Sequence, residues 1–323
     1  RMSSAPGARS DSVMVLSHIS GAVMTLGTFA IVGPVFAHAA DPAERRRMAL
    51  ACLRGLCLAV LWTPFTVGMG FAGSHFPGVP LWQAMACGAA AAALGLVVSL
   101  KDGGPRGLGP ALVSVRPLLG PVGAAALLLV AANAVTGLSS LSLIVLLMPP
   151  LCLGWLAARA PQGPAPAGRR LFGELGRMGG EMLLFSGSIA MGFVLNANPV
   201  FQEALAHTGL GALPPVEIMA VMVLVVIGCA LAGLHALVTG TIVVALAASL
   251  DGALSDLAVF TLLLFAWSTA AMLSVSSLAV AVTARTFRVP LSRVIYSSNL
   301  LFAAALGTGL TLAVGAAEAL ARP

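Results

Sequence analysis

Three short polar clusters interrupt an otherwise apolar chain, and their residue types suit ligand binding better than bond-making chemistry. The first is His235 with Thr239, Gly240 and Thr241, closely preceded by Gly233. A helix broken here by glycine would expose N–H groups at one end, which suit anions, and carbonyl groups at the other, which suit Na⁺. The alternative is a glycine-kinked helix whose His235 side chain hydrogen-bonds to a neighbouring helix.

The second cluster is a set of hydroxyl side chains within the apolar stretch 255–284: Ser268, Ser274, Ser276 and Ser277. A helix of this length spans about 45 Å, which is ample for a broken or kinked membrane crossing. Hydroxyls at mid-span can replace lost backbone hydrogen bonds or line a solute path. Packing of small residues between helices is the alternative role for each of them.

The third cluster is Thr63 and Thr66 around Pro64, in the apolar stretch 48–72. Pro64 cannot donate a backbone hydrogen bond, so it predicts a break that matches those in the second half. A simple proline kink is the alternative.

Carboxylates and enzyme motifs are missing from the centres of the apolar stretches. Glu181 and Glu217 fall near predicted helix starts, where the helix dipole favours an anion. The five cysteines lie in apolar runs without a C-x-x-C pair, and the sequence carries no H-E-x-x-H, G-x-S-x-G or P-loop motif. We therefore expect no enzyme activity, no cofactor and no proton pump built on a central Asp pair.

The composition indicates an all-α polytopic membrane protein with a single membrane domain over 1–323. Hydrophobic residues make up 59% of the chain and charged residues only 9%, against about 25% in soluble domains. The mean hydropathy is +1.01. The pI of about 9.7 comes without a basic patch, so nucleic acid is not an expected partner.

About ten transmembrane elements are predicted from runs of roughly 20 apolar residues. Two of them leave alternatives open. The stretch 216–250 is either two short helices or a re-entrant hairpin, and 13–39 is either one span or a hairpin. The predicted elements are 13–39, 48–72, 82–100, 118–135, 140–158, 178–196, 216–234, 237–250, 255–284 and 292–317.

The basic residues predict the orientation. Most of the 17 Lys and Arg residues lie in or beside four connections, while the intervening loops carry none. By the positive-inside rule these four connections face the cytoplasm, in an integral protein of the plasma (inner) membrane. They are the basic loops 40–47, 101–117, 159–177 and 285–293.

Ten elements divide into two sets of five that start on opposite sides, as a 5+5 inverted repeat requires. The predicted halves are 13–158 and 178–317, joined by the cytoplasmic connector 159–177.

At Gly233–Thr241 and Trp267–Ser277 the chain resembles secondary carriers of the ion-transporter superfamily type, mainly over residues 216–300. The resemblance is to a Gly-x-His-Pro hairpin followed by a Ser-rich broken helix, with Ala236 here at the Pro position. It implies broken helices and hairpin tips around a central site, and a carrier of small, often anionic solutes driven by an ion gradient.

The leading hypothesis is therefore a secondary-active transporter for a small anionic solute, with Na⁺ or H⁺ as the coupling ion. Its partners would be the lipid bilayer and the solute, a homo-oligomer being one option. The alternative is a non-catalytic membrane subunit or assembly partner of a larger complex. The binding residues predicted for the carrier are His235, Thr239, Gly240, Thr241, Ser268, Ser274, Ser276, Ser277, Thr63 and Thr66.

Overall fold

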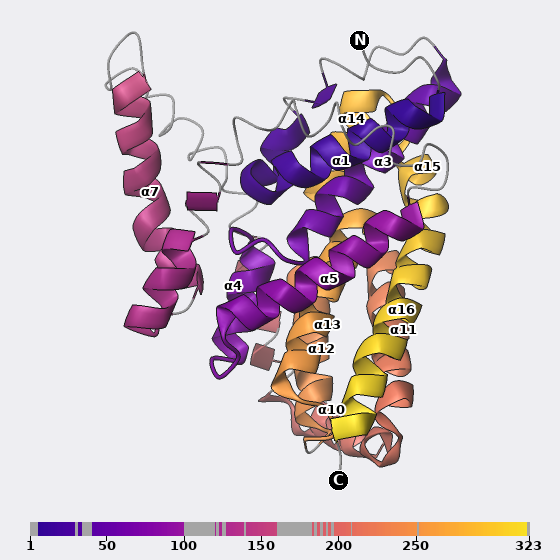
Figure 1. Cartoon of the computed structure of the whole chain (residues 1–323). Helices are drawn as coiled ribbons and strands as arrows, with labels where there is room; N and C mark the ends of the chain where they lie inside the picture. The colour runs from indigo at the N-terminus through magenta and orange to yellow at the C-terminus, as the bar shows by residue number, and fades with distance from the viewer. Residues whose placement is uncertain are drawn as a thin grey trace.

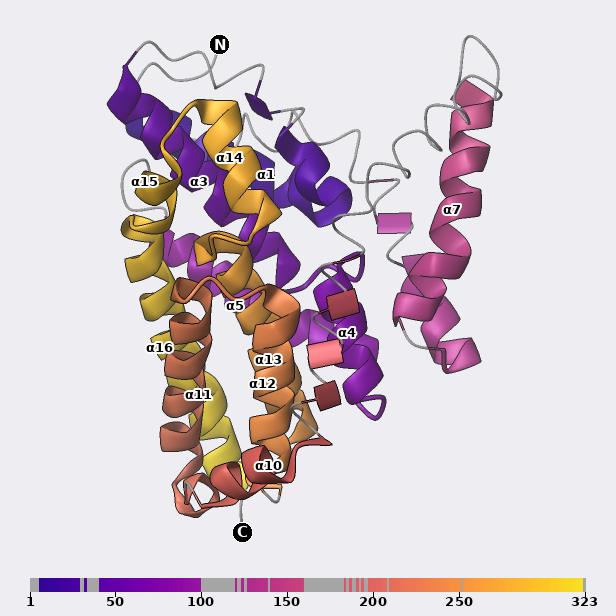
Figure 2. The ribbon, with the colours of Figure 1, turned by 180° about the vertical axis from the view of Figure 1, so that it is seen from behind.

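Helices are the regular elements of the computed structural model wherever it describes the chain (Figure 1). The first helix, Pro6–Met24, and the last residues of the final helix, Ser298–Ala321, lie at opposite ends of the helical body in both views (Figures 1 and 2). The structure describes residues 6–29, 32–33, 41–99, 120, 123–124, 127–138, 140–159, 183, 186–187, 190–191, 193–194, 197–207, 209–250 and 252–321.

Three of the described helical stretches are long and apolar enough to cross a membrane: Leu81–Ser99, Asp256–Phe287 and Leu291–Leu320. The labelled elements are α1 (Pro6–Met24), η1 (Thr25–Gly27), α3 (Pro42–Val60), α4 (Val67–His75), α5 (Leu81–Ser99), α7 (Ser140–Arg159), α10 (Pro199–Ala206), η4 (Leu210–Ala212), α11 (Pro215–Leu231), α12 (Ala236–Ala248), α13 (Asp256–Leu273), α14 (Leu278–Phe287), α15 (Leu291–Ile295) and α16 (Ser298–Ala321).

Two long helical paths are interrupted. The path of α3 and α4 breaks at residues 61–66, and the path of α13 and α14 breaks at residues 274–277. The first break contains Pro64, which has no N–H to continue a helix. The second contains three serines, whose side chains compete for backbone hydrogen bonds. The helix breaks predicted within 48–72 and 255–284 are thus confirmed.

The two interrupted paths run in opposite directions. Arg46 Nε donates to the carbonyl oxygen of Arg293 at 3.3 Å, which places the start of α3 beside α15, just before α16. At the other end of α16, both carboxylate oxygens of Glu318 accept hydrogen bonds from Ser255, the residue that caps the start of α13. Since α3 and α13 begin at opposite ends of α16, they are antiparallel (Figures 1 and 2).

A helical hairpin stands beside the second interrupted path, and a helix followed by a short turn stands beside the first. α11 and α12 are joined by residues 232–235, and Gly233 makes this turn with φ of +83°. α1 is followed by the short turn η1, in which Thr25 has φ of +45°. The stretch 216–250 forms two short helices joined by a tight turn, an arrangement common to both predicted alternatives, two short crossings and a re-entrant hairpin. The stretch 13–39 is also interrupted, although residues 30–31 and 34–40 lie outside the described part.

Glycine residues allow the closest packing of α3 with α1 and α5. α1 packs along α3, and a Cβ on Gly55 would lie 2.1 Å from the carbonyl oxygen of Met14. α5 crosses the end of α3, where a Cβ on Gly88 would lie 1.8 Å from the carbonyl oxygen of Leu61. The backbones therefore touch at two points where no side chain fits.

α7 stands beside the other labelled helices and makes its contacts with α4 (Figures 1 and 2). It begins and ends within one residue of the predicted element 140–158, and α5 does the same for 82–100. Residues 127–136 form a helix within the predicted element 118–135. Most of 178–196, and the loops 101–117 and 159–177 apart from Arg159, lie outside the described residues.

Replacing Gly55 with Ala should lower the free energy of unfolding by about 1–3 kcal/mol, the usual cost of overpacking a close contact. The matched control is Gly228→Ala within α11, where nothing lies within 4 Å of the added Cβ. This change should be neutral or raise stability by about 0.5–1 kcal/mol, because Ala favours helix over Gly. Thermal unfolding of the purified proteins in detergent measures both, and an equal loss in the two variants would contradict the packing.

Candidate functional site

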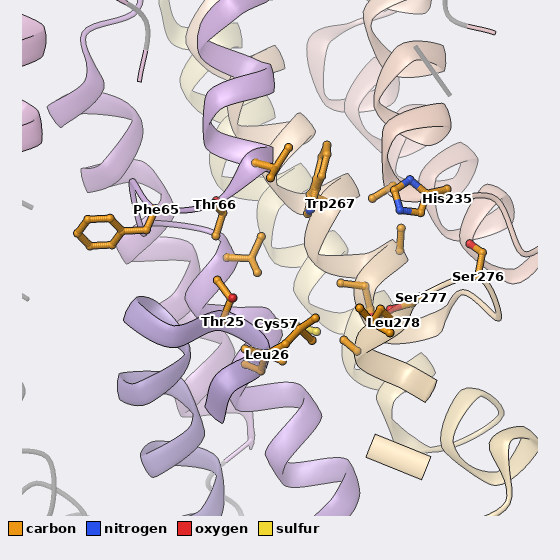
Figure 3. A pocket seen from close by; sticks show the side chains of 17 residues that line it. Thr25, Leu26, Cys57, Phe65, Thr66, His235, Trp267, Ser276, Ser277 and Leu278 are labelled. Atoms are coloured by element: carbon orange, nitrogen blue, oxygen red, sulfur yellow. Dashed lines mark hydrogen bonds between the residues drawn. The ribbon is translucent and has the colours of Figure 1, made fainter. Parts of the chain in front are cut away.

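The breaks at 61–66 and 274–277, the η1 turn and the α11–α12 turn meet at one cavity of about 350 Å³ (Figure 3). Thr25 and Thr66 lie on one side of it and His235 and Ser277 on the other, with Trp267 between them. Its lining residues come from four segments far apart in the sequence: Thr25, Leu26, Leu56, Cys57, Val60, Phe65, Thr66, Val67, His235, Ala236, Trp267, Ala270, Ala271, Ser276, Ser277, Leu278 and Ala279.

Three helices begin at this cavity, and each is capped by a residue of its wall. The Thr66 hydroxyl accepts from the N–H of Met69 at the start of α4. The Ser277 hydroxyl accepts from the N–H of Val280 at the start of α14. Nδ1 of His235 accepts from the N–H of Leu237 at the start of α12. Each cap takes one amide of a first turn, which leaves other N–H groups of that turn without an intrahelical partner.

Two side chains of the first break, Trp62 and Thr63, hold it against α1. The Thr63 hydroxyl donates to the carbonyl oxygen of Ala22, close before the η1 turn. The Trp62 indole donates to Nε2 of His18 at 3.2 Å, and Nδ1 of His18 lies 3.2 Å from the carbonyl oxygen of Gly55. Because an indole N–H can only donate, Nε2 must be the acceptor and Nδ1 the donor, so His18 is neutral in this arrangement.

The second break satisfies its own polar groups. The hydroxyls of Ser274 and Ser276 lie 2.9 Å apart, and the N–H of Ser276 donates to the Ser274 hydroxyl at 3.2 Å. The Ser277 hydroxyl donates to the carbonyl oxygen of Ala271 at 2.6 Å. A Cβ on Gly233 would lie 2.8 Å from a methyl carbon of Val275, so the α11–α12 turn packs directly on this break.

Backbone dipoles determine the electrostatic potential in the cavity. Its described lining includes no Asp, Glu, Lys or Arg. The N-terminus of a helix carries a partial positive charge of about half a proton. Three such ends face the cavity, and so do the last turns of α3, at Val60, and of α13, at Ala270 and Ala271, whose carbonyl ends carry the opposite partial charge. The cavity therefore offers N–H groups for a negative group beside carbonyl groups for a cation.

The structure brings four of the ten sequence-predicted residues to the cavity wall: Thr66, His235, Ser276 and Ser277. The others lie behind it. Thr63 ties the first break to α1, Ser274 bonds within the second break, and the Ser268 hydroxyl donates to the carbonyl oxygen of Cys57 at 2.9 Å.

The prediction that Thr239-Gly240-Thr241 forms a non-helical turn is wrong, because His235 caps α12 and all three residues are helical. The Thr241 hydroxyl donates to the carbonyl oxygen of Leu237 in its own helix. A Cβ on Gly240 would lie 3.0 Å from the Phe71 ring, so Gly240 serves the packing of α12 on α4. None of the three residues lines the cavity.

Sequence reasoning missed the η1 turn as part of the wall. Thr25 and Leu26 line the cavity and are followed by Gly27, the only conformational signal at this point. No proline or serine cluster marks the turn. Sequence reasoning also missed Cys57, Phe65 and Val67 as lining residues. Their place in the wall depends on the exact position of the first break, which the sequence does not give.

Comparisons of this chain with family models, with curated proteins and with solved structures found no match.

Replacing Gly233 with Ala should destabilise the protein more than replacing Gly252 with Ala. Both glycines have positive φ, of +83° and +77°, so both changes carry backbone strain of about 1–2 kcal/mol. Only Gly233 also has a neighbour in the way, Val275, whereas nothing lies within 4 Å at Gly252. Adding Val275→Ala to Gly233→Ala should recover the difference in unfolding midpoint. No recovery would show that the turn and the break are not in contact.

Proposed function

We propose that the protein is a secondary-active carrier for a small anionic solute, which binds in the cavity where the breaks and turns meet. The observation that carries the proposal is the convergence of three helix N-termini, at Thr66, His235 and Ser277, on one cavity without acidic lining residues. Helix ends of this kind bind carboxylate and phosphate groups in discontinuous transporter helices.

The walls of the cavity favour an organic anion with an apolar portion. Leu56, Val60, Phe65, Trp267 and Leu278 form much of its lining. A volume of about 350 Å³ lies at the small end of ligand pockets, roughly 300–1,000 Å³. A solute of one or two carboxylates on a short carbon skeleton would place its charge at the helix ends and its skeleton on these side chains.

The antiparallel arrangement supports an inverted repeat of smaller units than the halves 13–158 and 178–317. One unit comprises the α1–η1 turn, the broken path α3–α4 and α5. The other comprises the α11–α12 hairpin, the broken path α13–α14 and α16. Two such units around a central site are the arrangement that gives alternating access in secondary carriers. Under this proposal the breaks lie at mid-membrane and the basic segments 40–47 and 285–293 face the cytoplasm.

Reconstitution into proteoliposomes tests the proposal, with Na⁺ or H⁺ gradients imposed in either direction. The probes are small mono- and dicarboxylates, inorganic phosphate and sulfate, with a neutral and a cationic amino acid as non-anionic probes. We expect flux of at least one anion and none of the amino acids. His235→Ala and Ser276→Ala should each lower that flux by about two- to tenfold, the scale of losing one hydrogen bond.

Thr241→Val is the matched control for His235→Ala, because Thr241 lies on the same helix, is buried and does not line the cavity. It should leave flux unchanged at equal folded yield. Absence of flux for every anion under every gradient would overturn the carrier proposal in favour of a membrane subunit. Unchanged flux in both His235→Ala and Ser276→Ala would remove these residues from the site.

A further inference from the structure

A seam of arginines runs between α3 and the junction of α15 with α16, away from the central cavity. Arg46 and Arg54 are eight residues apart on α3, about 12 Å along the axis and about 80° around it. Arg46 contacts the backbone of Arg293, and Arg54 contacts the first turn of α16. The side chains of Arg46 and Arg54 therefore reach α15 and α16 at two successive levels, with Arg293 beside the first.

Arg54 is a half-buried cation whose contacts in the described part of the chain are neutral. Its guanidinium donates to the Asn299 side-chain oxygen from Nε at 3.1 Å and from Nη2 at 2.9 Å. Nη2 also lies 3.3 Å from the Ser298 hydroxyl, and the group stands 4.6 Å above the Phe302 ring. A cation at this depth in a membrane requires a counter-charge, and an amide oxygen supplies only a dipole.

The surroundings of the seam change from polar to apolar along α16. Tyr296 is 66% exposed at the polar end, where amphipathic rings lie at a membrane–water interface. Leu301, one turn further along, is 73% exposed. The carboxylate of Asp41 at the same end of α3 is occupied in capping that helix, since it accepts from the N–H groups of Ala43 and Glu44.

We propose that this seam binds the phosphodiester headgroup of an anionic phospholipid, with an acyl chain lying along α16 past Leu301. Guanidinium forks match phosphate oxygens, and basic sites between helices at the cytoplasmic end are typical headgroup sites. The lipid phosphate supplies the counter-charge that Arg54 does not receive from the described residues, and it joins the start of α3 to the start of α16. The proposal assumes that the protein lies in a membrane, but it does not depend on the solute or on transport.

The test is a thermal-shift titration of the purified full chain in detergent. The added lipids are phosphatidylglycerol and, as the zwitterionic comparison, phosphatidylcholine with the same acyl chains. Phosphatidylglycerol should raise the unfolding midpoint and phosphatidylcholine should not. Arg46→Gln and Arg293→Gln should each raise the half-saturating phosphatidylglycerol concentration about fivefold, as expected for one basic residue near a headgroup.

Arg285→Gln is the control, because Arg285 is an exposed arginine on α14 outside the seam. It should respond to phosphatidylglycerol as the parent protein does. Equal stabilisation by phosphatidylcholine, or an unchanged response in both seam variants, would overturn the proposal. Inorganic phosphate or glycerol phosphate producing the same shift would also overturn it, since the site would then take a free anion. Because Arg293 is exposed, its variant decides the question if Arg46→Gln folds poorly. A negative result here would leave the flux experiment unaffected.

Discussion

Backbone groups released by a helix break in an apolar interior must find partners, and this constraint organises the centre of the molecule. An unsatisfied N–H or carbonyl in such surroundings costs several kcal/mol. Thr66 and Ser277 meet the requirement by capping the helices that follow the breaks, and His235 does the same after the hairpin turn. The residues that would meet a ligand are therefore also those that make the breaks stable. This explains how a chain with few charges maintains a polar centre.

Close backbone approach allows the breaks to meet. Gly68 lies against Trp267, where an added Cβ would lie 2.7 Å from the indole and would not fit. Gly240 lies against Phe71, where an added Cβ would lie 3.0 Å from the ring and would be very tight. The two aromatic rings lie 6.0 Å apart, so α4, α12 and α13 share one aromatic contact beside the cavity. Charged side chains secure the ends of the bundle instead. Arg46 donates to the backbone carbonyl of Arg293 at one end, and Glu318 accepts from Ser255 at the other.

The sequence predicts those parts of this structure that residue type alone determines. Pro64, Gly233 and the serines at 274–277 disfavour a continuous helix wherever they occur, and each marks an observed interruption. Thr25 could not be predicted, because a β-branched residue at positive φ is held there by tertiary packing. The role of Ser268 could not be predicted either, since the sequence does not show which neighbouring helix its hydroxyl reaches. Only the packed structure shows that its hydroxyl meets the carbonyl of Cys57.

The matching caps at Thr66 and Ser277 approach the cavity from antiparallel paths, and each accepts from the N–H three residues further on. Under the proposed inverted repeat, an approximate twofold axis would relate these two caps. A bound molecule without that symmetry would have two orientations of similar energy if only the caps were present. The unlike pair, Thr25 on one turn and His235 on the other, breaks this degeneracy. Under the carrier proposal, these two turns would determine which way round a solute lies.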